Sequence, residues 1–136
     1  MAYPNASVQQ YRKASIDSAT PLQLVVMLYD GAIRFLNQAR VAMQHHNLEK
    51  QNEYCLRAQD IVSELICCLD TARGGEVASS LFSLYSFVFD RIVQANLQDD
   101  VNYLDQAMRV LTELRESWSQ LEQMSNGAKQ GLANAS

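Results

Sequence analysis

The side chains that could carry chemistry in this chain are two histidines and three cysteines. His45 and His46 are adjacent, so on a helix their side chains point about 100° apart. Metal-binding histidine pairs on helices instead use i, i+3 or i+4 spacing. Cys55, Cys67 and Cys68 are an odd set without metal-ligand spacing. We therefore expect surface histidines, reduced thiols of a cytoplasmic protein, no metal and no cofactor.

Other catalytic patterns are also missing from the sequence. It contains no Glu-x-x-His motif, which carboxylate-bridged bundle enzymes require. Gly74-Gly75 is followed by Glu76-Val77 rather than by the lysine and hydroxyl of a phosphate-binding loop. No histidine is placed to activate a thiol, and Cys55 lies on an apolar stripe, where a small buried residue is expected. The sequence therefore predicts that the protein is not an enzyme.

Size and charge narrow the function further. The chain has 136 residues, 48% hydrophobic content and a net charge of −4, which fits one domain with a real core. Nucleic-acid binding is disfavoured because phosphate contacts need a concentrated basic face. No apolar stretch approaches the roughly 18–20 residues of a membrane helix, and the N-terminus lacks the apolar region of a secretory signal. We expect no nucleic-acid partner and no membrane insertion.

Apolar residues that recur every three or four positions predict helices along most of the chain. Thr20 and Pro21 are the start signals of the first helix, which we expect at about 21–45. Asp30-Gly31 is a dipeptide typical of tight turns, but the helical phase continues through it, and the turn is therefore rejected.

The later boundaries follow from caps and glycines. The expected signals are Asn47 as the cap of the second helix, 72–75 as its end, Glu76 as the start of the third, 96–99 as the next connection, Asp99 or Asp100 as the fourth cap, and 126–127 as the last end. Four helices of about 20–25 residues with short connections favour an all-α, antiparallel up-down-up-down bundle. A continuous coiled coil is the weaker alternative.

This pattern divides the chain into three parts. Residues 1–19 are polar and are expected to be a flexible N-terminal arm, residues 20–125 form the four-helix bundle, and residues 126–136 form a disordered tail.

Two of the predicted helices carry more apolar residues than one bundle stripe needs. The additional residues are Leu24, Val26, Leu28, Ile33 and Phe35 in the first helix and Phe82, Phe87, Phe89 and Val93 in the third. They form either a partner-binding surface or the interior of a broad core or homodimer seam. Gly31 permits close backbone approach, either of another helix or of a bound peptide.

Several segments of the chain resemble the flagellin-specific export chaperones, the FliS family. The matching segments are Tyr11, TPLQLVVMLYDGAIRFLNQA at 20–39, RAQDIVSEL at 57–65, LD at 69–70, GGEVASSLFSLY at 74–85, RIVQANLQDD at 91–100 and LTELRESW at 111–118. The resemblance spans about residues 8–120 in matching order. The sequence departs from the family pattern at Thr20, where serine is usual, and at Ser86–Phe89, where the family is rich in tyrosine.

The resemblance implies a cytoplasmic helical bundle that binds the C-terminal segment of flagellin, in a 1:1 complex. Covering this segment would prevent premature polymerisation and aid delivery to the flagellar type III export apparatus, without a nucleotide. In the family an N-terminal tyrosine, here Tyr11, is thought to fold over an apolar pocket when flagellin is absent. Contacts with export-gate components and a weak homodimer remain open.

The resemblance also suggests residues of the flagellin-binding site. They are Tyr11, Tyr29, Gly31, Ala58, Gln59, Val62, Leu81 and Tyr85. The Gln59 amide could hydrogen-bond an extended peptide, and Asp30 and Arg91 are expected to form a structural ion pair. The alternative is a structural, self-associating helical bundle without a flagellin client.

Overall fold

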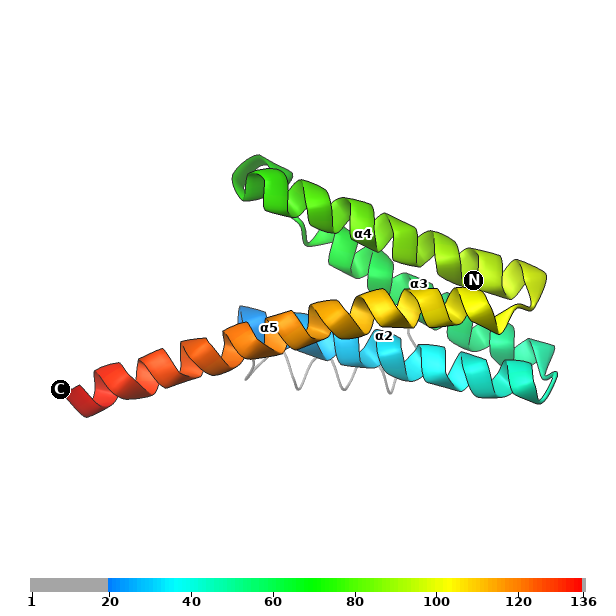
Figure 1. The fold of residues 1–136 in the computed structure, drawn as a ribbon, viewed down its shortest axis with the longest axis horizontal. Helices are drawn as coiled ribbons and strands as arrows, with labels where there is room; N and C mark the ends of the chain where they lie inside the picture. The colour runs from blue at the N-terminus through cyan, green and yellow to red at the C-terminus, as the bar shows by residue number, and fades with distance from the viewer. Residues whose placement is uncertain (1–19, 136) are drawn as a thin grey trace.

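The computed structural model describes residues 20–135, with the side chains of residue 71 and residues 128–135 excepted. This range contains no strand and folds into four helices (Figure 1). The helices are α2 (Pro21–Gln44), α3 (Leu48–Cys67), α4 (Thr71–Gln98) and α5 (Val101–Ala135). The predicted all-α helical bundle is confirmed.

The helices pack in a ring around one apolar core. α2 contacts α3 and α5, and α4 contacts the same two helices, so α2 and α4 are diagonal to each other. The chain reverses direction at each connection in Figure 1. Fully buried core residues come from every helix, including Leu36, Val62, Ile92 and Leu104. Burial of this shared apolar stripe is the main stabilising force of a bundle.

α2 begins and continues as the sequence predicts. The Thr20 hydroxyl accepts a hydrogen bond from the Gln23 backbone N–H at 3.1 Å, and the Gln23 side chain accepts one from the Thr20 N–H at 2.9 Å. This capping box satisfies two N–H groups that an open helix end would leave unpaired. The helix passes through Asp30 and Gly31 without a break, so the rejection of a turn at this dipeptide is confirmed.

The boundary between α3 and α4 differs from the prediction. Asn47 caps α3 as expected, but α3 ends at Cys67, and the Asp70 side chain then caps a new helix by accepting from the Arg73 N–H at 3.2 Å. The predicted end of the second helix at 72–75 is therefore wrong. Gly75 instead breaks α4 internally, with φ 55° and ψ −130°, a conformation that glycine adopts without a Cβ clash.

The connection between α4 and α5 is shorter than predicted, because α4 continues to Gln98. Asp99 has φ 53° and accepts a hydrogen bond from the buried Gln51 amide at 2.7 Å. The Asp100 side chain accepts from the Asn102 N–H at 2.9 Å, as one of the two predicted caps. Polar contacts of Gln51 on α3 with Asn96 of α4 and with Asp99 of the connection therefore fix this end of the bundle.

The end of α5 is also different from the prediction. The helix continues through Gly127 to Ala135, so the segment that we expected to be disordered starts within a helix, and the end predicted at 126–127 is wrong. Gly75 is the one glycine in the described range with a positive φ. Gly127 thus costs helix propensity, about 1 kcal/mol relative to alanine, but does not end the helix.

Candidate functional site

The side of α4 that faces α5 is covered along only part of its length. Arg91 marks this side, because its guanidinium lies 5.0 Å from the ring centre of Tyr103 on α5. Val88, Leu84 and Val77 precede Arg91 at helical spacing on the same side. Val88 is fully buried, but the exposed fraction rises to 37% at Leu84 and to 70% at Val77. α5 therefore stops covering α4 in the N-terminal half of that helix.

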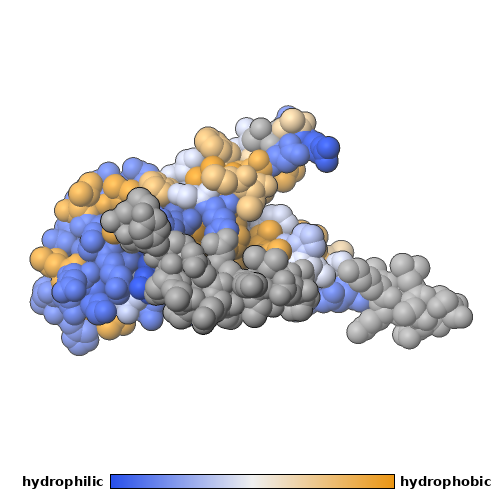
Figure 2. All heavy atoms as spheres, turned by 180° about the vertical axis from the view of Figure 1, so that it is seen from behind, coloured by the Kyte–Doolittle hydropathy of each residue, from blue (hydrophilic) through white to orange (hydrophobic). Residues whose placement is uncertain are grey.

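The corresponding side of α5 becomes exposed toward its C-terminal end. Leu114 still packs against the core, whereas Leu121, seven residues later, is 48% exposed. In Figure 1 this part of α5 and the N-terminal part of α4 diverge. Hydrophobic residues gather where the two ends separate in Figure 2. We call this surface the apolar cleft and define it by Val77, Leu81, Leu84, Leu114 and Leu121.

Three hydrogen-bonded aromatic residues lie in the core next to the apolar cleft. Tyr29 of α2 and Tyr85 of α4 share a hydrogen bond of 2.5 Å between their hydroxyl oxygens, and the Trp118 indole of α5 donates to the Tyr29 oxygen at 3.1 Å. Both tyrosines are almost completely buried. Burial disfavours the phenolate, so it raises the pKa of both tyrosine hydroxyls above the ordinary value. The neutral hydroxyls can then donate as well as accept.

These contacts connect helices that otherwise pack little against each other. α2 and α4 are diagonal in the bundle, and the Tyr29–Tyr85 hydrogen bond crosses that diagonal. Trp118 adds α5 to the same cluster. Because an unpaired buried hydroxyl is costly, the three side chains constrain the distance between the helices at the base of the apolar cleft.

The structure separates the predicted binding residues into core and surface positions. Tyr29, Ala58, Val62 and Tyr85 belong to the buried core, so in this conformation they support the surface rather than offer area to a partner. Leu81 is half-buried and lines the apolar cleft. Tyr11 lies outside the described residues. Direct contact of these side chains with a partner stays a prediction.

Gly31 and Gln59 lie at different helix contacts. A Cβ atom at Gly31 would be 3.1 Å from the Ile61 Cδ1 atom, so of the two alternatives for this glycine the structure favours close packing of α2 against α3. Gln59 lies two turns after Asn52, whose side chain accepts a hydrogen bond from Asn96 of α4 at 3.0 Å. Gln59 is therefore on the side of α3 that faces α4, outside the apolar cleft.

The predicted ion pair between Asp30 and Arg91 is wrong. Asp30 of α2 accepts a hydrogen bond from the Arg115 Nε of α5 at 2.7 Å. Arg91 instead pairs with Asp90 and donates to Gln106 of α5 at 3.4 Å. Both results follow from the ring arrangement, in which α5 lies between α2 and α4.

The apolar residues in excess of the bundle stripe have mixed positions. Val26 and Phe35 are buried, and Leu28, Ile33 and Phe89 pack on the core, as the core interpretation predicts. Phe82 and Phe87 are exposed, as the partner-surface interpretation predicts. The exposure of Val77 and Leu121 was not predicted, because helical periodicity assigns both to the buried stripes of their helices.

The cysteine and histidine side chains have the expected exposures. Cys55 is buried, and burial raises the pKa of its thiol to about 11. Cys67, Cys68 and both histidines are exposed. In the described part of the chain no three His, Cys, Asp or Glu side chains form a potential metal site, and none of its helices has the length and apolarity needed to cross a membrane.

A helical bundle with an exposed apolar cleft has the kind of surface found in proteins that bind a partner along an apolar face. A family model described as flagellar protein FliS matches residues 4–125. The chain belongs to this FliS family.

The relatives support the same assignment. A flagellar secretion chaperone FliS of Vibrio cholerae is 38% identical over 119 residues, which cover 85% of this chain and 88% of that protein. The proteins of the same name from Bacillus subtilis and Salmonella typhimurium are each 32% identical, covering 89% and 88% of this chain and 90% and 92% of their own length. Their names describe chaperones, so the prediction that the protein is not an enzyme is confirmed.

Proposed function

We propose that this protein is a cytoplasmic export chaperone that binds the disordered C-terminal segment of flagellin in a 1:1 complex. Covering this segment prevents premature polymerisation, and the complex delivers flagellin to the flagellar type III export apparatus, where export-gate components are further partners. The observation that carries the proposal is the apolar cleft, in which α4 exposes Val77 and α5 exposes Leu121. The chain that carries this cleft belongs to the FliS family.

The shape and chemistry of the cleft suit an amphipathic segment. Val77, Leu81 and Leu84 follow one another at intervals of four and three residues, which matches the apolar spacing of a helix that packs alongside α4. Such a client helix would complete the contact that α5 leaves open. A client that is disordered when free spends part of this energy on its own ordering.

The buried aromatic residues give the cleft a firm base. Tyr29, Tyr85 and Trp118 are hydrogen-bonded to one another, so client side chains that reach the base meet a preformed apolar surface. A preformed surface reduces the ordering cost of binding. No nucleotide takes part, and the export machinery releases the client.

The N-terminal arm regulates access to the same surface in this proposal. Tyr11 covers apolar surface in the free protein and is displaced by flagellin. Deleting residues 1–15 should therefore change flagellin affinity or self-association. If both quantities were unchanged, the arm would have no regulatory role.

Calorimetric titration tests the client directly. The titrant is a peptide of about the last 40 residues of the cognate flagellin, long enough for coupled folding and binding. We expect saturable 1:1 binding with a negative heat-capacity change, because apolar surface is buried. A scrambled peptide of the same composition is the control. Equal affinity for both peptides, or no binding of either, would reject flagellin as the client.

A further inference from the structure

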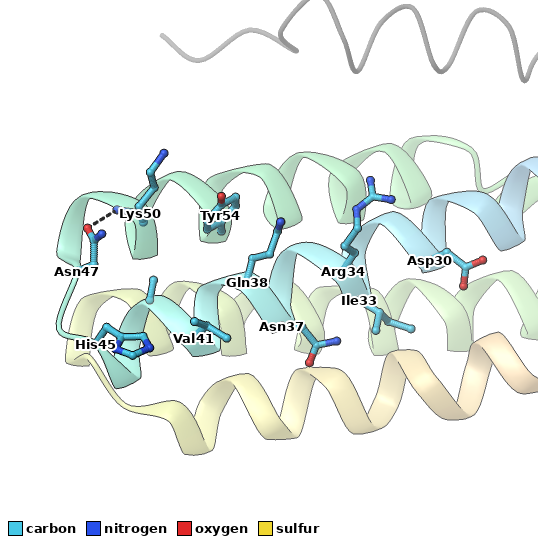
Figure 3. Close-up of a pocket in the computed structure, with 11 residues that line it drawn as sticks. Asp30, Ile33, Arg34, Asn37, Gln38, Val41, His45, Asn47, Lys50 and Tyr54 are labelled. Carbon is cyan, nitrogen blue, oxygen red and sulfur yellow. Dashed lines mark hydrogen bonds between the residues drawn. The ribbon is translucent and has the colours of Figure 1, made fainter.

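A second concave surface lies between α2 and α3, away from the apolar cleft (Figure 3). This α2/α3 groove has a volume of about 730 Å³. Its lining includes Ile33, Arg34, Val41, His45, Lys50 and Tyr54. The α2 part runs from Asp30 to His45, which corresponds to a length of about 22 Å on a helix. The groove can therefore accept about four turns of another helix.

The groove carries positive charge that its own walls do not neutralise. Arg34 is exposed, and no carboxylate among the described side chains forms an ion pair with it. Its guanidinium lies 5.4 Å from the centre of the Phe35 ring. The acidic wall residue, Asp30, is already paired with Arg115. A helix with a carboxylate and apolar residues would complement this surface.

The C-terminal part of α5 carries the carboxylate and apolar side chains that would complement the α2/α3 groove. In Figure 1 it extends past the rest of the bundle, and the helix continues ten residues beyond residue 125, where the family match ends. Met124 is 69% exposed in this extension, and Glu116, two turns earlier on the stretch of α5 that still packs against the bundle, is also exposed. A short helix without a tertiary partner is only marginally stable in water. This part of α5 therefore gains stability from a second docking surface.

We propose that the α2/α3 groove of one copy of this chain receives the C-terminal part of α5 from a second copy. Arg34 and Val41 are seven residues apart, and Glu116 and Met124 are eight residues apart. On helices these separations are about 10.5 Å and 12 Å. Glu116 can therefore pair with Arg34 while Met124 covers Val41, which is itself exposed in the groove.

The charge of the N-terminal residues disfavours them as the occupant. Residues 1–19 contain Arg12 and Lys13 but only one carboxylate side chain, Asp17, so they would bring positive charge to a positive groove. The inference also does not depend on the proposed function, because self-association is measured without any client.

Sedimentation equilibrium of the full chain over a range of concentrations tests the inference. We expect reversible self-association that Arg34→Glu or Glu116→Arg each weakens at least ten-fold, while the two substitutions together restore it. Arg109→Glu is the matched control, since Arg109 is an exposed arginine outside the groove that forms no ion pair within the described residues. A wild-type monomer at all concentrations, an unchanged single variant, an unrestored double variant or an equal effect of Arg109→Glu would overturn the inference.

Crosslinking gives a second test that tolerates modest changes in stability. Copies with Val41→Cys are mixed with copies with Met124→Cys, both carrying Cys67→Ser and Cys68→Ser, because these two native thiols are exposed. Mild oxidation should give a disulfide between the two kinds of copy. Leu97→Cys replaces Val41→Cys in the control, because Leu97 is more exposed than Val41, at 73% against 51%, but lies on α4. Equal crosslinking in both mixtures, or none in either, contradicts docking in the groove.

Discussion

Replacing the two most exposed apolar side chains of the apolar cleft should weaken client binding while leaving the fold intact. Val77 is 70% exposed and Leu121 is 48% exposed, so Val77→Ser with Leu121→Ser removes side chains that contribute little to the core. Full burial of such a side chain is worth about 1.5–3 kcal/mol. The part still exposed in the free protein therefore leaves about 1–1.5 kcal/mol per residue to be gained on binding.

The double variant should thus lose about 2–3 kcal/mol of binding free energy, which raises the Kd by about 30- to 150-fold. The assay is the calorimetric titration with the flagellin peptide, accompanied by thermal unfolding of each variant. The expected shift in Tm is small, because surface substitutions usually change the free energy of unfolding by less than about 0.5 kcal/mol.

Leu48→Ser with Leu97→Ser is the matched control. These leucines are 61% and 73% exposed, but Leu48 begins α3 and Leu97 lies near the end of α4, away from the apolar cleft. The control should bind the peptide like the wild type. If both double variants lost affinity equally, or if neither did, the assignment of client binding to the apolar cleft would be refuted.

Three further perturbations test the packing and the remaining site residues. Gly31→Leu should lower the free energy of unfolding by about 1–3 kcal/mol through overpacking against Ile61. Gly31→Ala should be tolerated because the flexible Ile61 Cδ1 atom can move. Urea unfolding of the two variants distinguishes these outcomes. Burial raises the pKa of Cys55 to about 11 and that of Tyr29 and Tyr85 above 10.0. These groups therefore lose their protons at lower pH in the unfolded chain than in the folded protein. Their contribution to the free energy of unfolding should be fully present below about pH 9 and should fall as the pH rises further. Thermal unfolding between pH 7 and 11 measures this loss of stability. Cys55→Ala should shift the pH at which Tm begins to fall toward pH 10. A Tm that stayed constant over this range would contradict burial of these groups. Gln59 lies outside the apolar cleft, so Gln59→Ala tests whether the client extends onto the side of α3 that faces α4. On such an extension peptide binding should weaken with little change in Tm, and an equal loss of both would make Gln59 a structural residue.

The helices themselves were predictable because their signals are local. Thr20 and Asn47 accept hydrogen bonds from residues three positions later, and Pro21 has a φ already suited to the first helical position. The apolar periodicity reports directly which face is buried. The missed boundary at Cys67 has a local reason too, since the Asp70 side chain caps a new helical turn before the glycines.

The position of the candidate site could not be predicted in the same way. Val77 and Leu121 continue the same apolar stripes as the buried Val88 and Leu111, so periodicity assigns all four to a core. Whether a stripe is covered depends on how far the neighbouring helix extends beside it, which is a property of the assembled bundle. The Asp30 ion pair likewise depended on which helix lies beside α2.

The sequence alone determined that this chain is a helical bundle of the FliS family. Helix periodicity, caps and family motifs each depend on residues that are close together along the chain. Only the tertiary structure decided that Tyr29, Tyr85 and Trp118 meet in the core and that α4 and α5 diverge beyond them. These features depend on the relative directions of helices whose contacting residues are 33 to 89 positions apart. No pattern of neighbouring residues specifies contacts between positions so far apart in the sequence.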